Sequence, residues 1–102
     1  MKPVTLCGSM RFEAQMQTIA LELETRYGMN VLQCVYNPKK AELTGSDLDA
    51  LAAAHYRKID LSEAIYVVDL DGYVGESVKR EIVYAEERGK EILYHSAWSR
   101  KV

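Results

Sequence analysis

The run Ala64-Ile-Tyr-Val-Val68 constrains the fold more than any other segment of the chain. Every residue in it is apolar or aromatic, whereas a strand with one face in water alternates apolar and polar residues. An uninterrupted apolar run is typical of a strand that is buried on both faces, as in a parallel sheet. Parallel strands need long crossover connections, which are usually helices. The run therefore predicts an α/β fold.

Three further strands and three helices are predicted around this run. Short apolar runs predict strands at Val4–Cys7, Val31–Val35 and Glu91–His95. Apolar residues recur at helical spacing over Met10–Tyr27, from Ser46 to Ile59, and over Glu76–Arg88. This order predicts one flavodoxin-like, Rossmann-like three-layer sandwich over residues 1–102. Its parallel sheet would have four strands, or possibly five, in the order 2-1-3-4.

Composition excludes several classes of partner. The chain has 102 residues and a net charge of −2, with no cluster of Lys and Arg, so we expect no nucleic-acid polymer as a partner. No apolar run approaches the length that spans a membrane. The two cysteines, Cys7 and Cys34, lack metal-ligand spacing, and Cys7 lies in a predicted strand. We therefore expect a reduced, cytoplasmic protein with a buried structural thiol at Cys7 and no metal or cofactor.

Two loops should meet where the strand order reverses, which is where ligands bind in sheets of this kind. In the first loop, Gly8 and Ser9 let backbone N–H groups approach a ligand, and Arg11 suits a phosphate or carboxylate. A plain tight turn with a solvated Arg11 is the alternative. In the second loop, Asp69 either caps the loop or binds a ribose hydroxyl. Gly75 opens the helix that follows it.

The acids of that helix differ in their neighbours. Glu76 has Arg80 four residues on and Glu86 has Lys90, a spacing that predicts surface ion pairs. Glu81 has no cation at either i±4 position and lies beside the apolar face of the helix. Near a helix N-terminus, such a carboxylate suits a nucleophile. The alternative is a half-exposed glutamate bonded to a loop amide or to Arg88.

The second helix offers two further candidates. His55 shares one face with the apolar positions of that helix, and Asp60 lies at the end of it. A histidine on such a face is either a satisfied core residue or a catalytic one. Asp60 is a plausible second acid. Ser46 and Asp49 approximate a capping box that would begin the helix, and the shared face comprises Leu48, Leu51, Ala52, His55 and Ile59.

The segments Cys7–Arg11 and Gly75–Ala85 resemble the nucleoside 2-deoxyribosyltransferase superfamily, which includes the 2′-deoxynucleoside 5′-phosphate N-hydrolases. The resemblance implies that Glu81 attacks C1′ of a deoxyribose and forms a covalent glycosyl-enzyme, as in a retaining glycosidase. It also implies that Ser77 contacts the sugar or 5′-phosphate, with Gly8, Ser9 and Arg11 on the opposite wall.

The resemblance has one clear departure. The acidic residue on the family's second helix aligns near Arg57, so Asp60 or His55 would have to replace it. The family completes its sites across subunits, which implies a homodimer or larger homo-oligomer, with Trp98 and the C-terminal tail at the interface. A non-catalytic nucleotide-binding or sensor module on the same fold is the alternative function.

Overall fold

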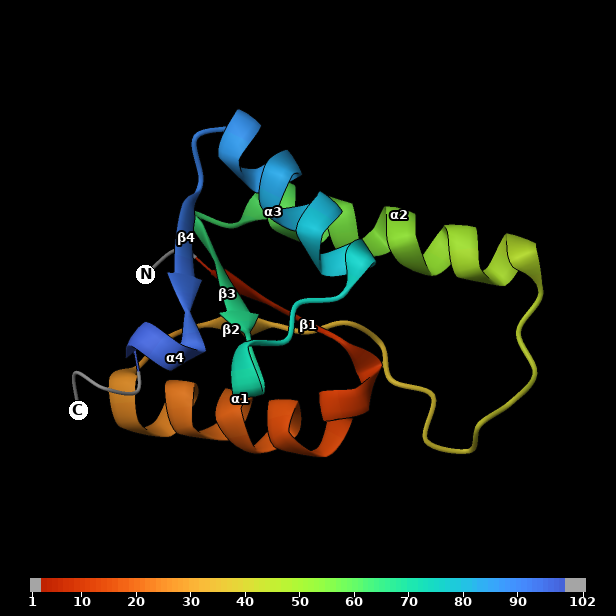
Figure 1. The fold of residues 1–102 in the computed structure, drawn as a ribbon, viewed down its shortest axis with the longest axis horizontal. Helices are drawn as coiled ribbons and strands as arrows, with labels where there is room; N and C mark the ends of the chain where they lie inside the picture. The colour runs from red at the N-terminus through yellow and green to blue at the C-terminus, as the bar shows by residue number, and fades with distance from the viewer. Residues whose placement is uncertain (1–2, 99–102) are drawn as a thin grey trace.

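The computed structural model describes residues 3–98, which form an α/β sandwich (Figure 1). Its four strands are all parallel and lie in the order β2-β1-β3-β4, as predicted. The strands are β1 (Val4–Gly8), β2 (Val31–Leu32), β3 (Ala64–Val68) and β4 (Glu91–Tyr94). No fifth strand is present in this part of the chain. Every residue of β3 is buried, which confirms the expectation from its apolar run.

Helices cover both faces of the sheet. They are α1 (Glu13–Tyr27), α2 (Gly45–Leu61), α3 (Glu76–Glu87) and the short α4 (His95–Trp98), with 3-10 turns η1 (Met10–Phe12) and η2 (Leu70–Gly72). In Figure 1, α1 and α4 lie below the sheet and α2 and α3 above it. Gly28, at φ 64°, ends α1 in the left-handed conformation that glycine adopts readily after a helix. None of these helices has the length and apolar character needed to cross a bilayer.

Side chains that alternate along the strands divide the core into two halves. Leu6 and Tyr66 point toward α1, where they pack with Met16 and Leu23. The intervening strand residues Cys7, Ile65 and Val67 face α2 and α3. They form a second cluster with Ile59 of α2 and with Val78 and Ala85 of α3. The thiol of Cys7 is therefore on the same side of the sheet as α2 and α3.

Strand β2 is shorter than the predicted Val31–Val35. Only Val31 and Leu32 pair with β1. The next carbonyl, that of Gln33, accepts a 2.6 Å hydrogen bond from Lys58 Nζ of α2 instead of a bond from the sheet. Val35 is 65% exposed as a result. The strand ends after Leu32 because the Lys58 side chain, and not a strand N–H, donates to the Gln33 carbonyl.

Helix α2 begins at a different capping box from the one predicted. Thr44 Oγ1 accepts from the backbone N–H of Asp47 at 3.1 Å, and the Asp47 carboxylate accepts from the N–H of Thr44 at 2.9 Å. Hydrogen bonding of the Asp47 carboxylate to the backbone N–H of Thr44, and then to the Thr44 side chain, holds the pKa of Asp47 below its ordinary value. The first half of the helix extends beyond the sheet, as Figure 1 shows. Leu48, predicted on the buried face, is therefore 55% exposed, while His55 and Ile59 are buried.

The charged residues of α3 that were predicted to form ion pairs contact other partners. Glu76 pairs with Lys79 at 3.1 Å, one residue before the expected Arg80. Arg80 instead donates to Ser77 Oγ at 3.4 Å. Lys90, the predicted partner of Glu86, donates to the backbone carbonyl of Asp60.

Helix α4 packs Trp98 inside the chain. The indole meets Tyr27 and Tyr66 edge-on, with ring centroids 5.7 and 6.5 Å away. Trp98 was predicted at a subunit interface, and here its neighbours are residues of its own core. The remainder of the predicted interface, residues 99–102, lies outside the described residues.

Candidate functional site

A cleft of about 890 Å³ opens at the carboxyl ends of β1 and β3, between α2 and α3. Gly8 and Ser9 line it at the end of β1. Leu48, Leu51 and His55 line it from α2. The α3 side contributes Gly75, Glu76, Ser77, Val78, Arg80 and Glu81, and parts of the 34–43 loop lie opposite. The cleft therefore occupies the position that the sheet order predicted.

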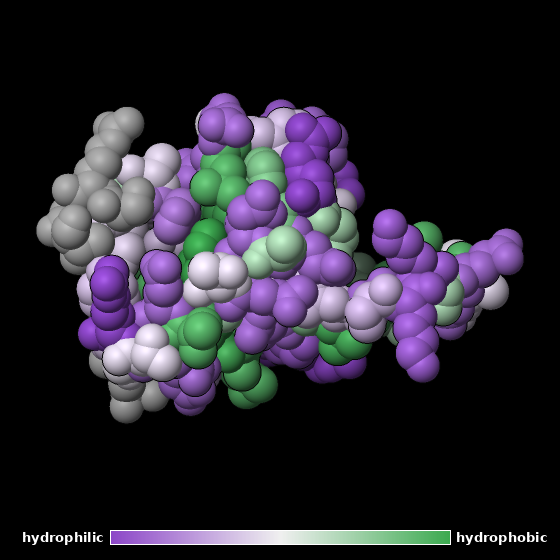
Figure 2. Space-filling view, turned by 90° about the horizontal axis from the view of Figure 1, so that it is seen from below, coloured by the Kyte–Doolittle hydropathy of each residue, from purple (hydrophilic) through white to green (hydrophobic). Residues whose placement is uncertain are grey.

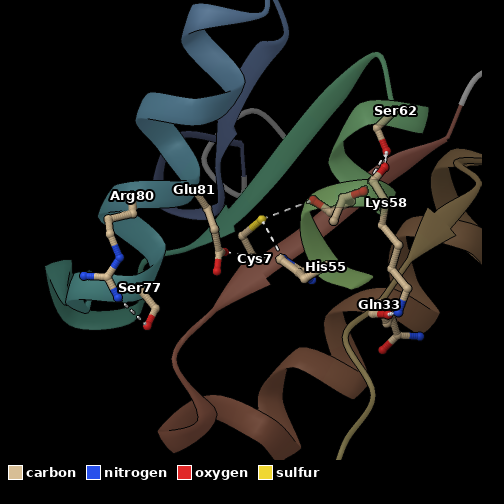
Figure 3. A network of polar contacts seen from close by, with 9 residues as sticks. Cys7, Gln33, His55, Lys58, Ser62, Ser77, Arg80 and Glu81 are labelled. Carbon is tan, nitrogen blue, oxygen red and sulfur yellow. Dashed lines mark hydrogen bonds and ion pairs between the residues drawn. The ribbon is translucent and has the colours of Figure 1, made fainter. Parts of the chain in front are cut away.

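Three side chains from three elements converge beside this cleft, as Figure 3 shows: Cys7 of β1, His55 of α2 and Glu81 of α3. His55 Nε2 lies 3.4 Å from Cys7 Sγ and 3.3 Å from Glu81 Oε1. The side chains of His55 and Glu81 are 10% and 15% exposed, and Cys7 is fully buried. Glu81 is therefore an inward-facing residue at the wall of the cleft, in contact with His55.

The same imidazole nitrogen faces both the thiol and the carboxylate. A nucleophile–histidine–carboxylate relay needs the two ring nitrogens to contact different partners. Here Nδ1 of His55 is buried and has no hydrogen-bond partner among the described residues. The three residues therefore do not form a cysteine-protease-type triad.

The Cys7 thiol is held in its protonated form. Burial raises its pKa well above the ordinary value of 9.0, and the charge of Glu81 and a hydrogen bond to Glu81 raise it further. A thiolate is the reactive form of cysteine. Cys7 is thus an unreactive thiol on its own, and its predicted burial is confirmed. Its contact with His55 was not predicted.

Most of the predicted site residues meet at the cleft. Gly8, Ser9, His55 and Glu81 line it, together with Gly75 and Ser77 at the start of α3. A Cβ on Gly8 would lie 3.0 Å from Met16 Sδ and 3.1 Å from Val68 Cβ. This glycine is required by close packing beneath the loop.

Three predicted site residues do not reach the cleft. Arg11 stacks on Tyr73, with its guanidinium carbon 3.7 Å from the ring centroid. Asp69 accepts from the backbone N–H and hydroxyl of Ser96, at 2.9 and 2.6 Å, and so holds the start of α4. Asp69 does not cap its own loop, because its side chain makes no cap hydrogen bond to the turn at Leu70–Gly72.

Asp60 is the third of these residues. Its carboxylate accepts from the Tyr84 hydroxyl at 2.8 Å and lies 3.6 Å from Arg88 Nε. A helix that crosses between parallel strands ends at the edge of the sheet opposite the ligand site. Asp60 lies at the end of α2 and is therefore too far from the cleft to be the second acid that the sequence predicted.

Sequence reasoning missed the cations and the apolar wall of the cleft. Lys40, Lys58 and Arg80 line it, as do Leu48 and Leu51. Figure 2 shows that the extension at the right of the molecule is mostly hydrophilic, with some hydrophobic residues among the hydrophilic ones. Helical periodicity placed these leucines on one face of the helix, but it does not show which element that face contacts.

Comparisons of the chain with known protein families, with curated proteins and with solved structures find no match.

Proposed function

We propose that the cleft binds a nucleoside or nucleoside 5′-monophosphate and that Glu81 attacks C1′ of its sugar to cleave or transfer at the N-glycosidic bond. The observation that supports this most directly is the position of Glu81, a carboxylate only 15% exposed on the wall of the large cleft. A nucleophilic carboxylate of a retaining enzyme needs such a position, because the glycosyl ester that it forms must be shielded until the acceptor arrives.

The surroundings of Glu81 suit the other parts of a nucleotide. Gly75 and Ser77 lie at the N-terminus of α3, where backbone N–H groups and the helix dipole favour a phosphate, and Arg80 adds a positive charge. Leu48 and Leu51 offer an apolar wall to a base. These features support a ligand that extends from the start of α3 toward α2.

The proposed reaction has two steps. A Glu81 oxygen bonds to C1′ as the C1′–N bond breaks, and the departing base takes a proton, which lowers the barrier to its release. His55 is the acid nearest to Glu81 in the cleft and replaces Asp60 in this role. Water then gives a proton to His55 as its oxygen bonds to C1′ and the bond from C1′ to Glu81 breaks, which releases the sugar and the free carboxylate; in a transfer, the nitrogen of a second base takes the place of the water.

Base release by Glu81→Gln tests the assignment. Wild type, Glu81→Gln and Glu87→Gln are assayed with deoxynucleosides and their monophosphates, in the presence of EDTA. Glu87 is an exposed acid of the same helix outside the cleft, so Glu87→Gln carries the same chemical change without touching the site. We expect the Glu81 variant to lose at least about a thousandfold in kcat while the control keeps its rate. No release by wild type would refute the activity, and equal rates would refute the nucleophile.

A non-catalytic nucleotide-binding module is the second candidate. The contact between His55 and Glu81 and the location of Asp60 away from the cleft favour it. It predicts a rise in Tm with a nucleoside monophosphate but no base release, because a ligand that binds only the folded state stabilises it.

The predicted homo-oligomer and the cytoplasmic location belong to the proposal as well. Leu48 and Leu51 are 55% and 36% exposed, and burial of such side chains would favour self-association. Light scattering of the purified protein measures the mass in solution, and a monomer would contradict a shared site.

A further inference from the structure

We propose that Cys7 Sγ, His55 Nε2 and a carboxylate oxygen of Glu81 form a binding site for a thiophilic divalent cation of the zinc type. The three ligand atoms all lie within 4.8 Å of one another, and among residues 3–98 they are the one such group of cysteine, histidine and acidic side chains. This inference does not depend on the proposed glycosidic activity, since it concerns what the apo cluster binds.

The distances agree with the edges of a tetrahedral zinc site. Bonds of about 2.3 Å to sulfur and about 2.0 Å to nitrogen and oxygen, at tetrahedral angles, separate S from N by about 3.5 Å and N from O by about 3.3 Å. The observed separations are 3.4 Å for Cys7 Sγ and His55 Nε2, and 3.3 Å for His55 Nε2 and Glu81 Oε1. Small side-chain adjustments suffice to seat a cation between them.

Two buried polar atoms of the cluster have no hydrogen-bond partner among the described residues. Glu81 Oε1 is buried and accepts no hydrogen bond among the described residues. Nδ1 of His55 is also without a partner there, and with the ring proton on Nδ1 the Nε2 lone pair is free to coordinate. Buried polar atoms are rarely left in this state. A cation would satisfy the thiol, the imidazole and the carboxylate together.

The donor set selects the class of metal. A sulfur and an imidazole nitrogen suit Zn²⁺ and similar ions, whereas Mg²⁺ and Ca²⁺ prefer oxygen ligands alone. Binding replaces the Cys7 S–H bond with a bond from sulfur to the metal, and the thiol proton passes to the solvent. Three protein ligands leave a fourth position for water or a ligand in the cleft, which His55 and Glu81 both line.

Cobalt spectroscopy tests the site directly. Co²⁺ is added to EDTA-treated wild type, Cys7→Ala, Cys34→Ser and Glu81→Gln. Wild type should bind one equivalent with a near-ultraviolet thiolate-to-cobalt charge-transfer band and the visible bands of tetrahedral cobalt, and Zn²⁺ should displace it. Cys34→Ser removes the other thiol, which lines the cleft, and should keep the band. Cys7→Ala should lose it, while Glu81→Gln should weaken affinity at least about tenfold.

Absence of the band in wild type, its persistence in Cys7→Ala, or its loss in Cys34→Ser would overturn the proposal. If circular dichroism shows that Cys7→Ala does not fold, the test depends on Glu81→Gln. An affinity for Co²⁺ equal to that of wild type in that variant would then overturn the proposal. The cobalt experiments contain no nucleoside substrate, and the base-release assay contains EDTA and therefore no free metal. Failure of the metal proposal can thus be distinguished from failure of the proposed glycosidic activity. If both proposals hold, Zn²⁺ should inhibit base release by wild type because it occupies the Glu81 carboxylate.

Discussion

His55 Nε2 lies 3.3 Å from Glu81 Oε1, and this contact joins α2 to α3 beside the cleft. The two side chains are mostly buried, so the dielectric around them is lower than at the surface and their interaction is stronger than that of an exposed pair.

A double-mutant cycle should detect this interaction. We expect His55→Gln and Glu81→Gln each to reduce the free energy of unfolding, because each leaves the other side chain buried without its partner. The double variant should lose less than the sum of the two, with a coupling energy of about 1 kcal/mol. Urea unfolding in EDTA measures all four proteins. Losses that simply add would mean that the contact stabilises nothing.

Gly8→Ala should destabilise the fold by about 1–3 kcal/mol, because the added methyl group overpacks the core. The new Cβ would come within 3.0 Å of Met16 Sδ and 3.1 Å of the Val68 side chain, both fully or almost fully buried. Met16 can shift more easily than the β-branched Val68. Thermal or urea unfolding gives the change.

Gly45→Ala is the matched control. Gly45 begins α2, and a Cβ there would meet nothing within 4 Å. The same substitution should be neutral or stabilise by about 0.5 kcal/mol, because alanine restricts the unfolded chain more than glycine does. Equal losses at both positions would show that packing around Gly8 is not the cause.

Stability should fall as the solution becomes alkaline. The pKa of Cys7 is raised above its ordinary value of 9.0 by burial, so the stabilisation from its protonated form is complete below that pH and declines as the pH rises. Urea unfolding between about pH 8 and pH 10, with EDTA and a reductant, should show the decline.

Cys7→Ala should flatten this decline. Cys34→Ala should flatten it less, because burial also raises the pKa of Cys34 but that residue is only partly buried. The tyrosines Tyr36 and Tyr66 have raised pKa values through burial as well, so together with Cys34 they contribute to the slope that remains. A Cys7→Ala curve parallel to that of wild type would contradict the assignment.

Asp69→Ala should weaken the fold and leave the cleft intact. The variant loses both bonds to Ser96, and we expect a cost of about 1 kcal/mol, as for a lost helix cap. Ser96→Ala loses only the hydroxyl bond and should cost less. Thermal shifts with a nucleoside monophosphate should be the same size in Asp69→Ala as in wild type, whereas a residue that binds the ribose would reduce them.

The order of the sheet was predictable because continuous apolar runs and crossover helices leave few arrangements. The position of the cleft followed from that order, and Glu81 was singled out by its lack of a cation at i±4. The length of β2 was not predictable, since it depends on the bond from Lys58 to the Gln33 carbonyl. That bond joins residues far apart in the sequence.

The partners of Glu81 were not predictable for a related reason. Helical periodicity places Glu81 and His55 on the inner faces of their helices, but the approach of α2 to α3 is set by packing of both on the sheet. The alternation of β1 does turn Cys7 toward that side. Asp60 could have been excluded from the sequence, because the end of a crossover helix lies away from the carboxyl edge of the strands.

The packing of Trp98 gives the protein a built-in optical probe. It is the sole tryptophan of the chain, and its ring lies edge-on to Tyr27 and Tyr66. Excitation of these tyrosines can therefore pass to one indole, whose emission reports on the α1 side of the sheet. The cleft residues His55 and Glu81 belong to helices on the other side. A change in the emission of Trp98 when a ligand or cation binds would therefore mean that binding alters the packing on the opposite face of the sheet.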